Sequence, residues 1–237
     1  MSAPIRFVYL DAGGTLIDPF PSVGAIYARA GRAFGLHASE AELGAAFASV
    51  WRDTRAAEGV RMMTFGLDEP ATHAFWRGVV FEVLDAVRFT GDREGCFRAF
   101  FAAFETPEAW RVYPDVAPLL DGLAARGVPA GVLSNWDFRL PPLLARLGLI
   151  PRLDPLVVSC FEGVAKPDPE LYRRAAARIG VPPEQILYVG DHRDLDLEPA
   201  LEAGFDAYLI RRRGPSEDPR VITSLTALLD RLPGVSD

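Results

Sequence analysis

The chain has 237 residues, 49% of them hydrophobic and 24% charged, with 21 glycines and 20 prolines. This composition is typical of a folded globular protein and excludes a disordered chain. The 25 basic and 32 acidic residues give a formal net charge of −7. That balance argues against nucleic acid or an anionic membrane as a partner.

The two cysteines and the start of the chain indicate a cellular compartment. Cys96 and Cys160 are isolated, and neither belongs to a cluster with the spacing of a zinc site. The apolar run at residues 5–10 ends at Asp11, too soon for a signal peptide or a membrane span. We therefore expect a cytoplasmic protein with reduced thiols and no membrane attachment.

The first third of the chain combines one strand with a long helical stretch. Residues 5–10 are followed by Asp11 and a glycine pair, which predicts a buried strand that carries a carboxylate at its tip. Residues 18–111 hold 11 of the 15 Phe and 3 of the 4 Trp, enough for an apolar centre of their own. We expect these aromatic side chains to form the core of a helical cap. Helices are predicted at 25–34, 41–55, 71–87 and 94–104.

After residue 114 the pattern changes to an alternation of helices and short apolar runs. Such alternation predicts a parallel sheet with helices on both faces. The expected fold is therefore α/β, a doubly wound Rossmann-like core of residues 1–17 and 112–237 with a helical cap domain at 18–111. The predicted strands are 129–133, 156–159, 186–189 and 206–210, and the predicted helices are 115–126, 142–147, 169–179, 197–203 and 224–232.

Polar residues close each predicted strand. In open parallel sheets ligands bind beyond the carboxyl ends of the strands, so these residues are expected to meet in one crevice. Two carboxylates, a hydroxyl and an ammonium at one edge indicate a functional site, since no structural core needs them. Lys166 is the only lysine among the 25 basic residues. The strand-end residues are Asp11, Ser134-Asn135, Ser159 followed by Lys166, and Gly190-Asp191.

The order of these residues resembles a known family. The segments are Asp11-Ala-Gly-Gly-Thr15, Leu133-Ser134-Asn135, Lys166-Pro-Asp-Pro and Gly190-Asp191-x-x-x-x-Asp196. Together they are similar to the four signature motifs of the haloacid dehalogenase-like (HAD) hydrolase superfamily. The likeness covers about the whole chain, because residues 18–111 fall where that superfamily inserts a helical cap. One such motif alone is weak, whereas four in order are specific.

The resemblance implies a Mg²⁺-dependent hydrolase of a small phosphorylated metabolite. Asp11 would attack phosphorus and form an aspartyl-phosphate that water then hydrolyses. The Asp11 carboxylate, the Gly13 backbone carbonyl and Asp191 would hold Mg²⁺, which prefers oxygen ligands. This positive charge offsets the negative charge that spreads over the phosphoryl oxygens.

The remaining motif residues are implied to support this reaction. The Lys166 ammonium would contact both Asp11 and a phosphate oxygen, as a compact point charge can. Ser134 and Asn135 would bind the phosphoryl group, and Thr15 would donate a hydrogen bond near the nucleophile. Asp196 would lie behind the metal ligands, where it orients Lys166 or the metal's waters.

One position departs from the family pattern. Phosphatases of this superfamily carry a second Asp two residues after the nucleophile, as general acid and base, and this chain has Gly13 there. Loss of a positioned general acid or base typically slows a reaction by about 10²- to 10⁴-fold, or roughly 3 to 5 kcal/mol of barrier. The expected consequence is a slow or specialised phosphatase.

Gly13 leaves three interpretations open. The enzyme could use substrates with good leaving groups or borrow a proton donor such as His192. It could be a metal-independent 2-haloacid dehalogenase, although that branch places Tyr at this position and does not need the acid that Asp191 provides. It could also bind a phosphorylated ligand without turnover. The phosphonate-cleaving branch is excluded, because it uses a cap lysine and residues 18–111 contain none.

The cap is expected to set specificity by closing over the site. Three of its arginines, Arg52, Arg55 and Arg61, are candidates to meet an acidic substrate. A solvated helix face is the alternative role for each of them.

Overall fold

A parallel β-sheet forms the centre of the protein. The computed structural model describes residues 4–214 and 216–232, without the side chains at 58 and 60–62. Within these residues a six-stranded sheet has the order β5-β4-β1-β6-β7-β8, and every neighbouring pair is parallel. Its strands are β1 (Phe7–Leu10), β4 (Ala130–Ser134), β5 (Leu156–Val158), β6 (Ile186–Gly190), β7 (Asp206–Ile210) and β8 (Val221–Ile222).

Helices follow most of these strands, as a doubly wound sheet requires. They are α5 (Val116–Ala125), α6 (Leu140–Arg146), α7 (Ser159–Glu162), α8 (Pro169–Ile179), α9 (Glu198–Glu202), the π-helical turn η5 (Arg193–Leu197), and the 3₁₀ segments η4 (Pro183–Gln185) and η6 (Leu225–Arg231). Two apolar clusters fill the spaces on the two sides of the sheet, one around Leu10 and Val132 and the other around Tyr9 and Tyr188. Of the described helices, none is both long enough and apolar enough to pass through a membrane.

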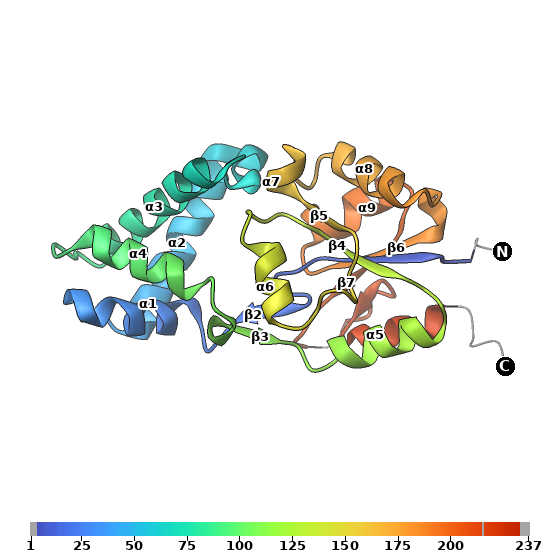
Figure 1. The fold of residues 1–237 in the computed structure, drawn as a ribbon, viewed down its shortest axis with the longest axis horizontal. Helices are drawn as coiled ribbons and strands as arrows, with labels where there is room; N and C mark the ends of the chain where they lie inside the picture. Colours follow the sequence, from blue (N-terminus) through green and yellow to red (C-terminus); the bar gives the residue numbers. More distant parts are fainter. Residues whose placement is uncertain (1–3, 215, 233–237) are drawn as a thin grey trace.

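A second group of helices lies between two short strands. The strands β2 (Ile17–Pro19) and β3 (Trp110–Val112) pair antiparallel, so the chain leaves and re-enters the sheet region through a two-stranded ribbon. Figure 1 shows α1 to α4 gathered on one side of the molecule and the sheet on the other. The elements of this group are α1 (Val23–Gly31), η1 (Arg32–Phe34), α2 (Glu40–Glu58), η2 (Gly59–Thr64), α3 (Glu69–Ala86), α4 (Arg93–Ala103) and η3 (Pro107–Ala109).

This helical group has an apolar cluster of its own, which includes Tyr27, Leu43, Val83 and Phe100. The helices α1 to α4 each begin after a residue whose side chain accepts a hydrogen bond from a backbone N–H of the first turn, which satisfies a donor that the helix leaves unpaired. At the start of α2, Ser39 and Glu42 form a reciprocal capping box. The predicted domain boundaries, 17/18 and 111/112, fall inside β2 and β3. The division into core and cap remains a prediction.

The structure differs from the sequence-based expectation in several short elements. The strands β2, β3 and β8 and the helix α7 are not predicted, because two to four residues are too few to show a periodic pattern. Ser159 begins α7 instead of closing β5. The predicted helix at 197–203 is divided between η5 and α9, and the last predicted helix is the 3₁₀ segment η6.

Candidate active site

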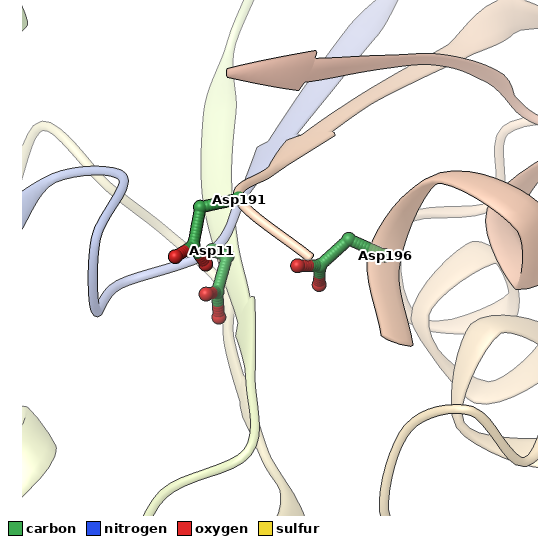
Figure 2. A group of neighbouring side chains, drawn as sticks. All are labelled: Asp11, Asp191 and Asp196. Atoms are coloured by element: carbon green, nitrogen blue, oxygen red, sulfur yellow. The ribbon is translucent and has the colours of Figure 1, made fainter. Parts of the chain in front are cut away.

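Three central strands bring the predicted carboxylates together. In β1, Leu10 pairs with Val132 of β4 on one side and with Val189 of β6 on the other. Asp11 therefore emerges between the ends of these two strands. Carboxylate oxygens of Asp11, Asp191 and Asp196 lie within 4.8 Å of one another, and Figure 2 shows the three side chains around one point.

Lys166 lies inside this cluster and is 2% exposed. Its Nζ donates to Asp11 Oδ1 at 2.9 Å and to Asp196 Oδ1 at 2.5 Å. Burial alone would lower the pKa of the Lys166 ammonium, but the charges of Asp11 and Asp196 outweigh it and raise that pKa above its ordinary value. The ammonium is therefore held charged and in contact with the predicted nucleophile.

Asp196 uses both carboxylate oxygens inside the protein. Its Oδ1 accepts from Lys166 and from the hydroxyl of Tyr188 at 2.7 Å, and its Oδ2 accepts from the backbone N–H of His192 at 2.8 Å. A Cβ on Gly190 would lie 2.2 Å from Asp196 Cγ, so only glycine fits beside this carboxylate. The π-helical turn η5 carries Asp196, and such turns are frequent at functional sites.

Tyr188 is a site residue that sequence reasoning missed. Its hydroxyl accepts from Lys166 Nζ at 2.9 Å and lies within hydrogen-bond distance of both Asp196 and the Leu133 carbonyl. It is fully buried in the middle of β6. The available signal was a tyrosine within a run of aliphatic residues, which must find a partner for its hydroxyl when buried.

Asn135 holds the loop that carries Lys166. Its Oδ1 accepts from the Lys166 backbone N–H at 2.8 Å, and its Nδ2 donates to the Lys166 carbonyl at 3.0 Å. Ser134, the last residue of β4, is buried, and its hydrogen bond to Asp11 opposes part of the rise that burial causes in the pKa of that carboxyl. Ser134 closes β4 and Asn135 follows it, and the Asn135 amide is directed to the Lys166 backbone.

The carboxylates of Asp11 and Asp191 lie close enough together that they could hold a divalent cation. Burial, followed by the nearby charge of Asp11, raises the pKa of Asp191 to about 7. Burial also raises the pKa of Asp11, against the opposing effect of Lys166. A cation between the two carboxylates would remove their repulsion, and carboxylate oxygens are the ligands that Mg²⁺ prefers. The absence of a side chain at Gly14 leaves room for the Asp191 carboxylate, since a Cβ there would lie 2.3 Å from Asp191 Oδ2.

Thr15 differs from the other predicted residues. It is fully buried, and its Oγ1 has no hydrogen-bond partner in the part of the chain that the structure describes. Its carbonyl accepts from an Arg212 guanidinium nitrogen. The structure does not bring it into the cavities beside Asp11 that are described below.

Gly13 faces an indole ring. A Cβ built on Gly13 would lie 3.2 Å from Cζ3 of Trp136, so a larger side chain would require that ring to shift by a few tenths of an ångström. The backbone N–H of Trp136 donates to Ser159 Oγ at 3.0 Å, and the ring packs on Trp110 with centroids 5.3 Å apart. Ser159 also donates to the Met63 carbonyl. Ser159 therefore supports Trp136 and does not join the carboxylate cluster.

Of the cavities that Asp191 lines, two also share Gly13, Asn135 and Trp136. The smaller, about 210 Å³, is lined by all the predicted site residues except Thr15. The larger, about 450 Å³, lies between the helical group and the sheet and shares Gly13, Trp136 and Asp191 with the smaller one. His192 lines both, and its Nε2 lies 3.9 Å from Asp191 Oδ2.

The three arginines singled out in the predicted cap lie in different surroundings. Arg55 lines the smaller cavity, 3.8 Å from Asp194. Arg52 is exposed beside Asp53, and the side chain of Arg61 is outside the described residues.

Comparison with known proteins agrees with this geometry. The sequence model of the family described as "haloacid dehalogenase-like hydrolase" matches residues 5–204. A zebrafish (Danio rerio) haloacid dehalogenase-like hydrolase domain-containing protein 3 is 30% identical over 215 residues, 90% of this chain and 88% of that protein. A Thermus thermophilus phosphoserine phosphatase is 28% identical over 93% of this chain and 94% of its own length.

A solved structure shows the same fold. The HAD-hydrolase YfnB from Bacillus subtilis, bound to magnesium, has a TM-score of 0.76 at 17% identity, over 97% of this chain and 99% of that one. The motif order, the carboxyl-end site and these matches agree, and the chain therefore belongs to the haloacid dehalogenase-like hydrolase family.

Proposed function

We propose that the protein is a Mg²⁺-dependent phosphatase that hydrolyses a small phosphate monoester through Asp11. The observation that carries this proposal is the contact of the Lys166 ammonium with Asp11 at 2.9 Å, with Asp191 in the same carboxylate cluster. Such a site combines a nucleophile with fixed positive charge, and phosphoryl transfer depends mostly on positioning and electrostatic stabilisation.

In this proposal each site residue has a separate role in the reaction. One Asp11 oxygen bonds to phosphorus as the ester P–O bond breaks, and the leaving oxygen departs with that electron pair and takes a proton from water. A second water then cleaves the aspartyl-phosphate, which releases phosphate, one proton and free Asp11. Lys166 stabilises charge on the phosphoryl oxygens while Asp196 and Tyr188 hold it, and Ser134 and Asn135 lie where the phosphoryl group would bind. Mg²⁺, held by Asp11, Asp191 and the Gly13 carbonyl, would supply further positive charge opposite the transferring phosphoryl group.

The relatives support a phosphorylated small molecule as substrate. A Methanopyrus kandleri glyceraldehyde 3-phosphate phosphatase is 41% identical over 101 residues, 42% of this chain and 43% of that protein. The net charge of −7 favours a small molecule over nucleic acid. The unpaired, buried cysteines Cys96 and Cys160 support the expectation of a cytoplasmic location.

The test is a panel of phosphate monoesters and 2-haloacids, each assayed with Mg²⁺ and with a chelator. We expect phosphate release that requires Mg²⁺ and that Asp11→Asn abolishes. Asp121→Asn, a change at an exposed carboxylate paired with Arg152, is the control and keeps full activity. Halide release in the chelator would instead identify a dehalogenase. Phosphate-ester binding without turnover would identify a binding protein.

A further inference from the structure

The larger cavity is lined mainly by aromatic rings. Half of its 22 lining residues are Phe, Tyr or Trp. Trp51 and Trp76 stack with centroids 5.7 Å apart and planes 5° apart, and Phe65 lies nearly parallel to both. A volume of about 450 Å³ is in the range of sites that enclose a small organic ligand. The shape and lining suit a planar apolar group.

Two of the charged side chains in its wall, Asp137 and Arg139, compensate each other. Asp137 is fully buried, and its two oxygens accept from Arg139 Nε at 2.9 Å and Nη2 at 2.6 Å. Trp76 Nε1 also donates to Asp137, at 2.7 Å. The Arg139 guanidinium lies over the Phe101 ring at 4.0 Å. Because the two charges of this buried pair compensate each other, the wall favours an uncharged group over a second anion.

The residue two positions after Asp11 cannot donate a proton to the leaving group. Gly13 has no side chain, and the Trp136 ring lies 3.2 Å from the place of a Cβ. A leaving group must then depart as an anion. A phenol such as the tyrosine side chain ionises near pH 10, whereas water ionises only near 15.7 and a simple alcohol is similarly weak. Without an acid, a phenolate leaves far more readily than an alkoxide.

These two observations converge on one class of substrate. Resting on the function proposed above, we infer that the enzyme hydrolyses monophosphate esters of planar, apolar phenols, whose ring lies among Trp51, Trp76 and Phe65 while the phosphate meets Asp11. The Asp11 oxygen forms a bond to phosphorus as the aryl P–O bond breaks, and the phenolate leaves with that electron pair and takes a proton from water. A second water attacks phosphorus, breaks its bond to Asp11 and yields phosphate, with one proton released to solvent.

The experiment compares kcat/KM for four substrates in the Mg²⁺-loaded wild-type protein. 1-Naphthyl phosphate has an apolar phenolic leaving group, and 2-(1-naphthyl)ethyl phosphate carries the same ring on an alkyl alcohol. 4-Carboxyphenyl phosphate has a charged phenolic leaving group, and acetyl phosphate is small and activated, so it does not need the cavity. We expect kcat/KM for 1-naphthyl phosphate to exceed that for the alkyl ester by at least about 100-fold. It should also exceed that for the carboxylated ester, because the wall favours an uncharged group.

Two variants test whether the preference for 1-naphthyl phosphate depends on the larger cavity. Trp51→Leu is expected to lower kcat/KM for 1-naphthyl phosphate by roughly five- to tenfold more than for acetyl phosphate, since a stacking face is lost. Phe89→Leu is the matched control, because Phe89 packs against the apolar centre of the helical group and does not line either cavity beside Asp11. It is expected to change neither rate.

Each of the other outcomes would reject either the substrate class or the proposed phosphatase activity. Equal rates for the aryl and alkyl esters would show that a proton donor such as His192 serves the leaving group, and equal rates for the carboxylated ester would show that the cavity accepts charge. Either result, with acetyl phosphate still hydrolysed, rejects the substrate class and leaves the proposed phosphatase standing. No hydrolysis of any of the four compounds rejects the phosphatase itself and the substrate class with it.

Discussion

Lys166 and Asp196 form a buried ion pair of 2.5 Å, and both side chains are at most 3% exposed. Loss of one partner would leave the other charge buried without compensation, which typically destabilises a protein by about 3–5 kcal/mol. We expect Lys166→Met to lose activity and to lower the free energy of unfolding by about that amount, measured by urea denaturation. A loss below about 1 kcal/mol would contradict the pairing, and exposed Arg152→Met is the control.

The Tyr188 hydroxyl is expected to matter for activity as well as for stability. Tyr188→Phe removes a hydrogen-bond partner of Lys166 and Asp196 and should cost about 1–3 kcal/mol of stability, with a lower kcat because Lys166 is less well held. Tyr9→Phe is the matched control, since its buried hydroxyl donates to the Ala175 carbonyl, away from the site. If the two variants have the same kcat, Tyr188 has only a structural role.

Magnesium is expected to raise the melting temperature. At a concentration 100 times its dissociation constant, a ligand stabilises the folded state by about 2.7 kcal/mol, which corresponds to about 5–10 °C for a chain of this size. Asp191→Asn should abolish this shift. In the presence of a chelator the same variant should melt above the wild type, because it removes a carboxylate that Asp11 repels. Asp121→Asn should show the full shift, and a shift that persists in Asp191→Asn would argue against the site.

A carboxylate at position 13 should act only if the Trp136 ring moves away or is removed. The Cβ of Gly13→Asp would lie 3.2 Å from the indole, so the single variant is expected to gain little activity on alkyl phosphates. The double variant with Trp136→Ala should exceed Trp136→Ala alone, by up to about 10²- to 10⁴-fold if the new group acts as general acid and base. Initial rates on an alkyl phosphate provide the measurement, and equal rates in the two variants would mean that the added carboxylate is not positioned to act.

The cysteines should be unreactive in the folded protein. Burial raises the pKa of Cys96 from 9.0 to about 11 and that of Cys160 to about 12. At pH 8 a disulfide reagent should therefore modify both thiols only after unfolding in guanidinium. Because the folded state retains these protons while unfolded thiols ionise near pH 9, this contribution to stability is present below pH 9 and is lost as the pH rises above it. Rapid labelling of the native protein at pH 8 would contradict this assignment.

The fold class and the residues that meet at the sheet edge could be predicted from the order of the motifs and the alternation of elements. Motifs that follow separate strands could be placed together, because parallel strands end at one edge. Asp11, Ser134, Lys166, Asp191 and Asp196 were found in this way. The long helices of the 18–111 segment were equally predictable from their spacing and capping residues.

The surroundings of these residues could not be predicted in the same way. The Trp136 ring against Gly13, the Asn135 amide on the Lys166 backbone and the Tyr188 hydroxyl between Lys166 and Asp196 are contacts between separate elements. A composition rich in aromatic residues predicted a cap core, but it could not show that some of those rings also line a cavity above Asp11. Side-chain packing across elements depends on three-dimensional register, which no local periodicity encodes.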